Sequence, residues 1–325
     1  MTRVLFRVAA GPSTGFGHLV RCRSIARALG VIPTTSIRGT RETRATAAAL
    51  GFDVRHGGVA LLRGLSRPDV LVIDDPSAEH AARWVRSARK AGVPVATLHD
   101  AGLAYTASDL AIDGSIAPRL DDPLLDLAGP VYAALDPSIA ATRAASPRPR
   151  TGVLVALGGG EHVQRWGLAL SLAVLERHPQ TSVRVAAGFT HMPQATADSR
   201  VVWVRAPHGL ADELRRAEVA VVGGGVTLYE AAALSAPVVA VAAVAEQQRT
   251  IHGFARRHAA VDGGLLETAS APAIADQIIR LLTNPPEARR LGQAGSRIVD
   301  GRGVFRVAEA VRRLARRSGR GSHAA

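Results

Sequence analysis

The sequence predicts an α/β protein built from two doubly wound parallel sheets. Short apolar, β-branched runs alternate with helical patterns along most of the 325 residues, as they do where helices cross over between parallel strands. A segment rich in proline, residues 137–150, interrupts this alternation, which then restarts. The length also fits two domains of about 150 residues each. We therefore expect an N-terminal domain at 1–136, a linker at 137–150, a C-terminal domain at 151–303, and a C-terminal helix with a basic tail at 304–325.

The first half opens with an apolar strand, expected at residues 4–10, that leads into a glycine loop and then a helix at 19–29. The run 69–74 is apolar until it ends in an acid, which is typical of a buried parallel strand. Further strands are expected at 31–37, 52–55 and 93–98, and helices at 42–50 and 77–91.

The second half restarts with an apolar strand at 152–157 and a second glycine loop. In open α/β sheets, ligands bind at the carboxyl ends of the strands, so loops that follow strands are the first places to look for a site. The further strands expected are 183–187, 201–204, 219–222 and 238–241, and the helices are 163–177, 210–216, 227–234, 247–258, 273–282, 286–300 and 304–317.

Charge and composition limit the class of protein. The formal net charge is +13, but all except one of the 40 basic residues are arginine, and they are scattered over most of the predicted helices. No basic stretch is interleaved with aromatic residues, so we expect no nucleic-acid partner. No apolar run is long enough to span a membrane, and no signal peptide is recognisable. The basic cluster that begins at residues 312–317 is interpreted as a solvated helix end and frayed terminus, and attachment to a membrane surface through it stays open. Cys22 is the only cysteine, which fits a cytoplasmic protein without an internal disulfide.

The first glycine loop brings a histidine to the start of a helix. Gly15 and Gly17 lie between the first strand and its helix, and His18 follows directly. The first N–H groups of a helix lack partners and its N-terminal dipole is positive, so anions bind well there. Histidine at this place is a candidate acid or base. The alternative is that His18 only caps the helix or hydrogen-bonds its own loop.

A third glycine loop, at residues 223–225, follows the strand at 219–222 and opens a helix. Gly224 and Gly225 would let a diphosphate approach the backbone, and the hydroxyl of Thr227 adds a donor. Glu230 lies three residues after Thr227, on the same side of the helix, where a carboxylate can accept hydrogen bonds from the two hydroxyls of a ribose. The alternative is a capping box formed by Thr227 and Glu230.

Other polar residues at strand ends carry weaker signals. Asp74 and Asp75 end one strand, and His99 with Asp100 ends the next, but acids at such places are often helix caps. The amides of Gln247 and Gln248 suit the hydroxyl and acyl groups of a sugar, or they simply begin an exposed helix. The P-loop lysine, the nucleophile elbow and any set of metal-ligating Cys and His residues are missing from the sequence.

Five motifs in order resemble one family. Residues 15–22, Gly-Phe-Gly-His-Leu-Val-Arg-Cys, resemble the G-x-G-H-x-x-R-C signature of the UDP-sugar hydrolases of pseudaminic acid synthesis, which the related spore-coat polysaccharide proteins share. Residues 129–137 are similar to the family's G-x-x-Y-x-x-L-x-P, and residues 158–161 to its G-G-S-D loop. Residues 224–230 resemble its G-G-x-T-x-x-E segment, which the lipid-II-forming N-acetylglucosaminyltransferases also have. Residues 300–307 resemble its D-G-K-G-x-x-R-I.

This resemblance implies a GT-B fold, with two Rossmann-like domains facing each other across a cleft and the nucleotide mostly on the second. It implies cleavage of a UDP-linked 2,4-diacetamido-2,4,6-trideoxy sugar by water, with His18 as the catalytic histidine. From its place at a strand end, Asp74 is the candidate acid that assists His18, and His99 with Asp100 is the alternative. The substrate-binding role carries over to a set of motif positions. These are Gly15, Gly17, Arg21, Gly159, Gly160, Gly224, Gly225, Thr227, Glu230, Gln247 and Gln248.

The chain departs from the family pattern at His99-Asp100, where the family has D-D, and at Glu161, Gln164 and Gln247, each of which is one methylene longer than the family's residue. A methylene in a fitted pocket shifts discrimination by about 1–3 kcal/mol, so these departures bear on the sugar more than on the fold.

The leading hypothesis is therefore a metal-independent UDP-sugar hydrolase that needs no cofactor and acts as a monomer or weak dimer. The alternatives are a glycosyltransferase with the same donor site and a nucleotide-sugar-binding protein without catalysis.

Overall fold

The computed structural model divides the chain into two compact units. The first comprises Met1–Pro137 with Arg302–Ala325, and the second comprises Ser138–Gly301. The residues that the structure describes are 2–11, 14–64, 67–101, 105–146, 148–159, 162–188, 198–206 and 209–321. No helix among these residues is both long enough and apolar enough to cross a bilayer.

The first unit is built on a parallel sheet with the strand order β3-β2-β1-β4-β5-β6-β7. β1 lies between β2 and β4, so the chain reverses its direction of winding there, and the carboxyl ends of β1 and β4 are the natural place for a ligand. The strands are β1 (Val4–Ala9), β2 (Thr34–Arg38), β3 (Asp53–Val54), β4 (Val70–Asp74), β5 (Val95–His99), β6 (Leu110–Asp113) and β7 (Leu127–Ala128).

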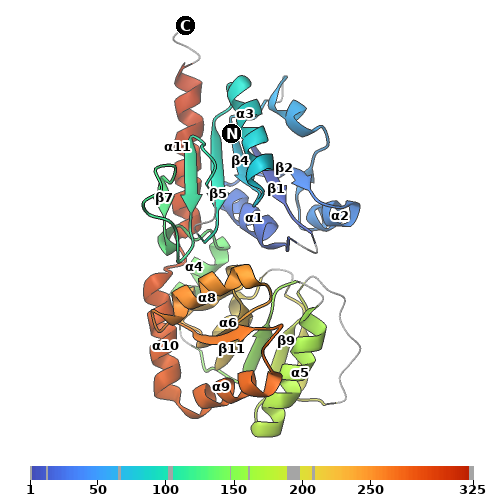
Figure 1. Ribbon diagram of the computed structural model, residues 1–325, viewed down its shortest axis with the longest axis vertical. Coiled ribbons are helices and arrows are strands. Elements are labelled where there is room, and N and C mark those ends of the chain that lie inside the picture. Colours follow the sequence, from blue (N-terminus) through green and yellow to red (C-terminus); the bar gives the residue numbers. More distant parts are fainter. Residues whose placement is uncertain are drawn as a thin grey trace. The chain divides into compact units, whose positions relative to one another are not determined.

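Helices cover both faces of this sheet, and one of them comes from the far end of the sequence (Figure 1). α11 (Gly303–Gly321) packs against α1 (Gly17–Leu29), and its Val304, Val307 and Val311 are fully buried in the core of the first unit. The helix therefore completes a core that the first 137 residues begin. The remaining helical elements are α2 (Arg41–Ala49), α3 (Ala78–Lys90) and the 3-10 turns η1 (Gly58–Leu62) and η2 (Pro130–Tyr132).

The second unit repeats the design with a parallel sheet of order β10-β9-β8-β11-β12-β13. Here the winding reverses between β8 and β11, and a glycine loop follows each of these strands. The strands are β8 (Val153–Ala156), β9 (Val183–Ala186), β10 (Val201–Val204), β11 (Val219–Gly223), β12 (Val238–Ala242) and β13 (Val261–Leu265). The helical elements are α4 (Pro137–Ala144), α5 (His162–Arg177), α6 (Ala211–Arg216), α7 (Val226–Ala233), η3 (Ala245–Gln247), α8 (Gln248–Ala255), α9 (Ala271–Thr283) and α10 (Pro285–Ile298).

The structure differs from the sequence expectation in the two segments where the chain passes from one unit to the other, and at three strands. The segment 137–150, predicted as a linker, begins with α4, whose Arg143 donates to the carbonyl of Ala233 at 2.6 Å. The helix predicted as a separate C-terminal segment belongs to the first unit. β6, β7 and β13 were not expected.

The sequence does not predict β13, because glycine and aspartate disfavour strands. Its Gly263 is explained by close packing, since a Cβ there would come within 2.6 Å of Val241.

Candidate functional site

The loop after β1 closes on itself and presents His18 in the first turn of α1. The backbones of Gly11 and Gly15 exchange two hydrogen bonds, and Gly15 has a φ of 80°, a left-handed conformation that favours glycine. The residue before the helix, Phe16, makes no capping bond with its side chain. The alternative that His18 only caps the helix is therefore wrong, because its ring is engaged elsewhere.

The His18 ring bonds the carboxylate that ends the neighbouring strand β4. Its Nδ1 lies 2.8 Å from Oδ1 of Asp74, which is 1% exposed. Nη2 of Arg21 lies 3.2 Å from the same Nδ1, but the Asp74 oxygen is nearer. A carboxylate can only accept, so this shorter contact favours the tautomer that is protonated at Nδ1 and carries its lone pair on Nε2. The described part of the chain offers Nε2 no hydrogen bond, and the side chain stays 17% exposed. The ring is thus oriented as a base.

Arg21 lies one turn after His18 and holds two carboxylates at once. Its Nε and Nη2 donate to the two oxygens of Asp74 at 2.7 and 2.5 Å. Its Nη1 and Nη2 donate to the two oxygens of Asp100 at 2.5 and 2.9 Å. Asp100 follows β5, the next strand after β4, and its side chain is 46% exposed. Two bidentate pairs on one guanidinium fix the whole cluster.

The electrostatics of the cluster favour a basic imidazole beside an ionised acid. Burial by itself would lower the pKa of His18, but the charge and hydrogen bond of Asp74 outweigh it, and the pKa of His18 is raised. Burial alone would raise the pKa of Asp74, but the charges of Arg21 and His18 hold it well below its usual range. The positive charge of Arg21 opposes the rise at His18.

The same cluster has the composition of a metal site. Ligand atoms of His18, Asp74 and Asp100 lie within 4.8 Å of one another. The guanidinium of Arg21, however, lies between the two carboxylates and donates to both, so a cation already neutralises them. The donor set therefore fits an arginine-organised acid–base site better than a metal centre.

The neighbouring acid and histidine have structural partners. Asp75 accepts from the backbone N–H of Ser77 at 3.0 Å and pairs with Arg38 at 2.6 Å. It supports the start of α3 without being its cap, because Ser77 is the N-cap residue and its side chain accepts from the N–H of His80. His99 directs its Nε2 to the hydroxyl of Thr97 at 2.8 Å. Of the two strand-end pairs considered in the sequence, the structure brings Asp74 and Asp100 to His18 and leaves Asp75 and His99 outside its contacts.

In the second unit, the glycine loop after β11 opens α7 without a capping side chain. Gly225 is the N-cap residue, so Thr227 lies inside the first turn. A capping box needs its Thr at the N-cap position, and the capping-box alternative for Thr227 and Glu230 is therefore wrong. Thr227 is partly exposed, whereas Glu230 is 8% exposed within the helix. The uncapped helix start is suited to an anion.

Gly224 and Gly225 of this loop differ in whether packing within the protein excludes a side chain. A Cβ on Gly224 would lie 2.8 Å from the Cβ of Gln247 and 3.0 Å from Ile251, so packing within the unit requires glycine there. A Cβ on Gly225 would meet nothing within 4 Å, and this residue is exposed. Neither packing nor a left-handed φ explains Gly225. A bound group that approaches the backbone would explain it.

Gln247 braces the loop. Its Oε1 accepts from the backbone N–H groups of Ala243 at 2.9 Å and Gly224 at 3.3 Å, so this oxygen is already engaged within the protein. No sequence pattern indicated this brace. Gln248 begins α8 and is partly exposed.

Of the predicted loop after β8, Gly159 is described, whereas Gly160 and Glu161 lie outside the described residues. His162, at the start of α5, bonds the carbonyl of Leu157 through Nε2 at 3.0 Å and so ties the helix to β8.

Comparison with known proteins places the chain among proteins of the same fold. No family model matches it. It is 28% identical over 190 residues to the spore coat polysaccharide biosynthesis protein SpsG of Bacillus subtilis (strain 168), an alignment that covers 55% of this chain. The aligned part is 56% of that protein, so the match spans little more than half of the relative's length. The resemblance to the spore-coat polysaccharide proteins is thus confirmed.

Two solved structures extend the likeness over nearly the whole chain. The spinosyn rhamnosyltransferase SpnG complexed with thymidine diphosphate has a TM-score of 0.63 at 17% identity, and covers 95% of this chain and 100% of that one. The UDP-GlcNAc 2-epimerase of Neisseria meningitidis bound to UDP-GlcNAc has a TM-score of 0.62 at 12% identity, and the superposition covers 95% of this chain and 99% of the epimerase chain. The predicted GT-B fold with its two α/β domains is therefore confirmed. A transferase and an epimerase share it, so the fold does not select the reaction.

Proposed function

We propose that the chain is an enzyme that transfers a glycosyl group from a nucleotide sugar to an acceptor hydroxyl in polysaccharide biosynthesis. The motif resemblance favours UDP as the nucleotide of this donor. The observation that carries the proposed chemistry, activation of a hydroxyl by a base, is the contact of His18 with Asp74 at the carboxyl ends of β1 and β4. This contact leaves Nε2 as the basic atom of the site. The similarity to a spore coat polysaccharide protein and to a rhamnosyltransferase supports transfer as the reaction class.

Each residue of the His18 cluster has a distinct part in this reaction. Nε2 of His18 takes the proton of the attacking hydroxyl as its oxygen bonds the anomeric carbon. The bond from that carbon to the diphosphate breaks, and the electron pair leaves with the nucleotide. Asp74, kept ionised by Arg21, stabilises the imidazolium that forms. Arg21 and Asp100 are positioning residues.

The second unit is proposed to hold the nucleotide diphosphate. The uncapped start of α7 offers backbone N–H groups and a positive dipole to the charge that grows on the leaving group. Gly225 gives the phosphates access to the backbone, and Thr227 can donate its hydroxyl. Glu230, in the same helix, is proposed as the ribose contact.

Hydrolysis is a second candidate, in which water replaces the acceptor hydroxyl. It is favoured by the motif at residues 15–22, which resembles the signature of UDP-sugar hydrolases. The His18 cluster serves both reactions equally, because a base that deprotonates a sugar hydroxyl also deprotonates water. The choice depends on whether water reaches Nε2 productively in the absence of an acceptor.

The test uses the full chain with a panel of UDP- and dTDP-sugars, with and without a mixture of sugar and glycolipid acceptors, followed by NMR. Transfer predicts nucleotide release that depends on the acceptor, while hydrolysis predicts free sugar without it. His18→Ala should lower turnover by about 10²–10⁴-fold and leave nucleotide binding unchanged. Asp276→Asn, an exposed change in the second unit, serves as the control. Turnover that survives in His18→Ala would overturn the assignment of the base.

A further inference from the structure

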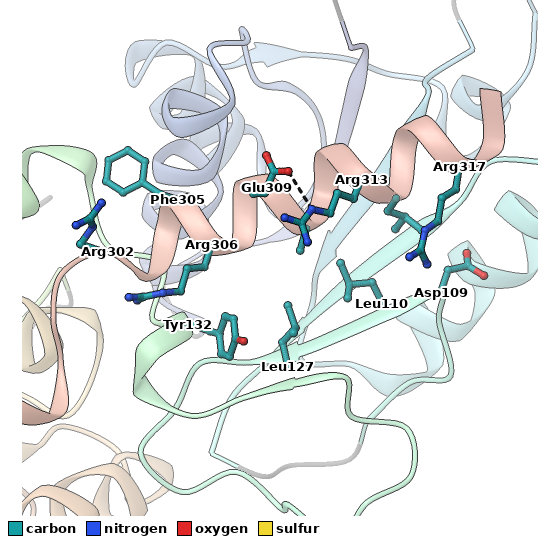
Figure 2. A pocket seen from close by; sticks show the side chains of 12 residues that line it. Asp109, Leu110, Leu127, Tyr132, Arg302, Phe305, Arg306, Glu309, Arg313 and Arg317 are labelled. Atoms are coloured by element: carbon teal, nitrogen blue, oxygen red, sulfur yellow. Dashed lines mark hydrogen bonds and ion pairs between the residues drawn. The ribbon is translucent and has the colours of Figure 1, made fainter. Parts of the chain in front are cut away.

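A groove of about 610 Å³ runs along α11 in the first unit. Figure 2 shows the side chains that line it: one wall is α11, and the other comes from the last two strands of the sheet and the turn η2. Leu110 of β6, Leu127 of β7 and Tyr132 of η2 give this second wall an apolar character. None of these residues belongs to the His18 cluster, so the groove is a separate feature.

The α11 wall of the groove carries a row of arginines. Arg306, Arg313 and Arg317 are spaced seven and four residues apart on one side of the helix, and Arg302, which immediately precedes α11, also lines the groove. At the rise of an α-helix the three arginines on α11 span about 16 Å. The row is therefore extended, whereas a site for a single small anion would draw its cations together.

The two acids that line the groove have partners of their own. Asp109 accepts from the backbone N–H of Val95 at 2.8 Å, and Glu309 pairs with Arg313 at 2.9 Å. Four arginines against these two acids leave the groove with a positive formal charge. Its charge thus complements an anionic surface rather than a neutral or basic one.

Large apolar side chains are exposed at one end of the arginine row. Phe305 is 42% exposed and Val131 is 44% exposed. Arg306, the residue after Phe305, donates to the carbonyl of Val131 at 2.8 Å. Figure 2 shows Phe305 beside Arg302 and Arg306. Apolar residues interspersed with arginine are characteristic of surfaces that rest in a membrane interface.

We propose that this groove and its rim, with Phe305 and Val131, form a docking surface for a membrane that carries anionic phospholipid. The arginine row matches the many phosphates of such a surface, and the exposed apolar side chains reach toward the acyl boundary. A duplex nucleic acid would use the arginines but leave Phe305 and Val131 without a role. The inference does not depend on the reaction proposed for His18.

The test is co-sedimentation of the full chain with vesicles at two salt concentrations. The vesicles are phosphatidylcholine alone, or phosphatidylcholine and phosphatidylglycerol in equal parts. The protein should bind only the anionic vesicles, more weakly at high salt. The variant Arg306→Gln with Arg317→Gln should lose about tenfold or more in affinity, because each arginine near the surface contributes to binding. Phe305→Ser should weaken the binding that survives at high salt.

A matched control removes two charges elsewhere. Arg289 and Arg290 are exposed on α10 of the second unit, and Arg289→Gln with Arg290→Gln should bind as the wild type does. Circular dichroism melts verify that each variant is folded. The proposal is overturned if the wild type ignores anionic vesicles or if the control loses as much affinity as the groove variant. It is also overturned if duplex DNA competes fully with the vesicles and Phe305→Ser has no effect.

Discussion

Arg21 and Asp74 form a bidentate ion pair at the base of the proposed active site, with Nε and Nη2 of the arginine at 2.7 and 2.5 Å from the two carboxylate oxygens. The same Asp74 oxygen that receives Nη2 also bonds Nδ1 of His18. The acid that orients the imidazole is therefore itself fixed by a cation one turn along the same helix. Four predictions follow from this arrangement and from the loop of the second unit.

The first concerns the pH dependence of turnover. His18 must be neutral to accept a proton, so kcat/KM should fall as the pH drops through its pKa, which Asp74 raises above the ordinary value near 6.5. Asp74→Asn removes the negative charge, so the pKa of His18 falls and the acid limb moves to lower pH. The plateau should also fall, by about 10²-fold or more, since the imidazolium is no longer stabilised.

Asp75→Asn is the matched control for this profile. Asp75 is adjacent in sequence but pairs with Arg38 and Ser77, so its loss should leave the acid limb where it was. An acid limb that stays in place in Asp74→Asn would contradict the assigned contact.

The second prediction concerns acid stability. Asp74 has a depressed pKa, so its contribution to the free energy of unfolding is present above the unfolded value near pH 4. This contribution is lost as the pH falls toward the folded value. Asp74→Asn removes the buried carboxylate that pairs with Arg21. The free energy of unfolding of this variant should therefore be about 3 kcal/mol lower than that of the wild type at neutral pH. Urea melts should show this difference from the wild type narrowing below about pH 4.

The exposed pair of Arg177 and Asp276 provides the reference for that measurement. Asp276 has 68% of its side chain exposed, so Asp276→Asn should change the unfolding free energy by at most about 1 kcal/mol. If the difference in unfolding free energy between the wild type and Asp74→Asn stays constant from neutral pH to strong acid, the ionisation of Asp74 does not contribute to stability.

The third prediction separates the two glycines of the nucleotide loop. Gly224→Ala introduces a methyl group 2.8 Å from Gln247 and should destabilise the protein by about 1–3 kcal/mol. Gly225→Ala meets no protein atom within 4 Å, so stability should change by less than about 0.5 kcal/mol. UDP affinity, measured by calorimetry, should nevertheless fall about tenfold in Gly225→Ala, or about 1.4 kcal/mol. Unchanged affinity there would remove the diphosphate from this loop.

The fourth prediction is stereochemical. A hydroxyl activated by His18 displaces the nucleotide in one step, so the new bond forms on the face opposite the leaving group. The product should have the inverted anomeric configuration, which proton NMR of the first turnover products reads directly. Retention would point to a covalent intermediate and to a nucleophilic role for a carboxylate such as Asp100.

Most elements could be predicted from the sequence because their signals are local. The strand at 219–222 and the helix that follows it were placed correctly within a residue or two, since a valine-rich run and three glycines mark the boundary. β13 could not be predicted, because its Gly263 disfavours a strand when only the sequence is considered. The reason for glycine there is the close packing of Val241 in the adjacent strand β12.

The partners of His18 depended on information that no local pattern contains. Asp74 lies 56 residues from His18 and 53 from Arg21, and Asp100 lies 79 residues from Arg21. Many other acids are as far away in the sequence, and only the strand order β1-β4-β5 selects these two. The brace from Gln247 to Gly224 likewise appears only once β11 and β12 lie side by side.

The position of α11 has a consequence for how the chain matures. Its Val304, Val307 and Val311 are part of the core that encloses α1 and β1, so the hydrophobic interior of the first unit stays open until these residues leave the ribosome. The second unit is contiguous, Ser138–Gly301, and has all its strands before then. Domains generally fold as units during synthesis. The half of the protein that is translated first is therefore the half that finishes folding last.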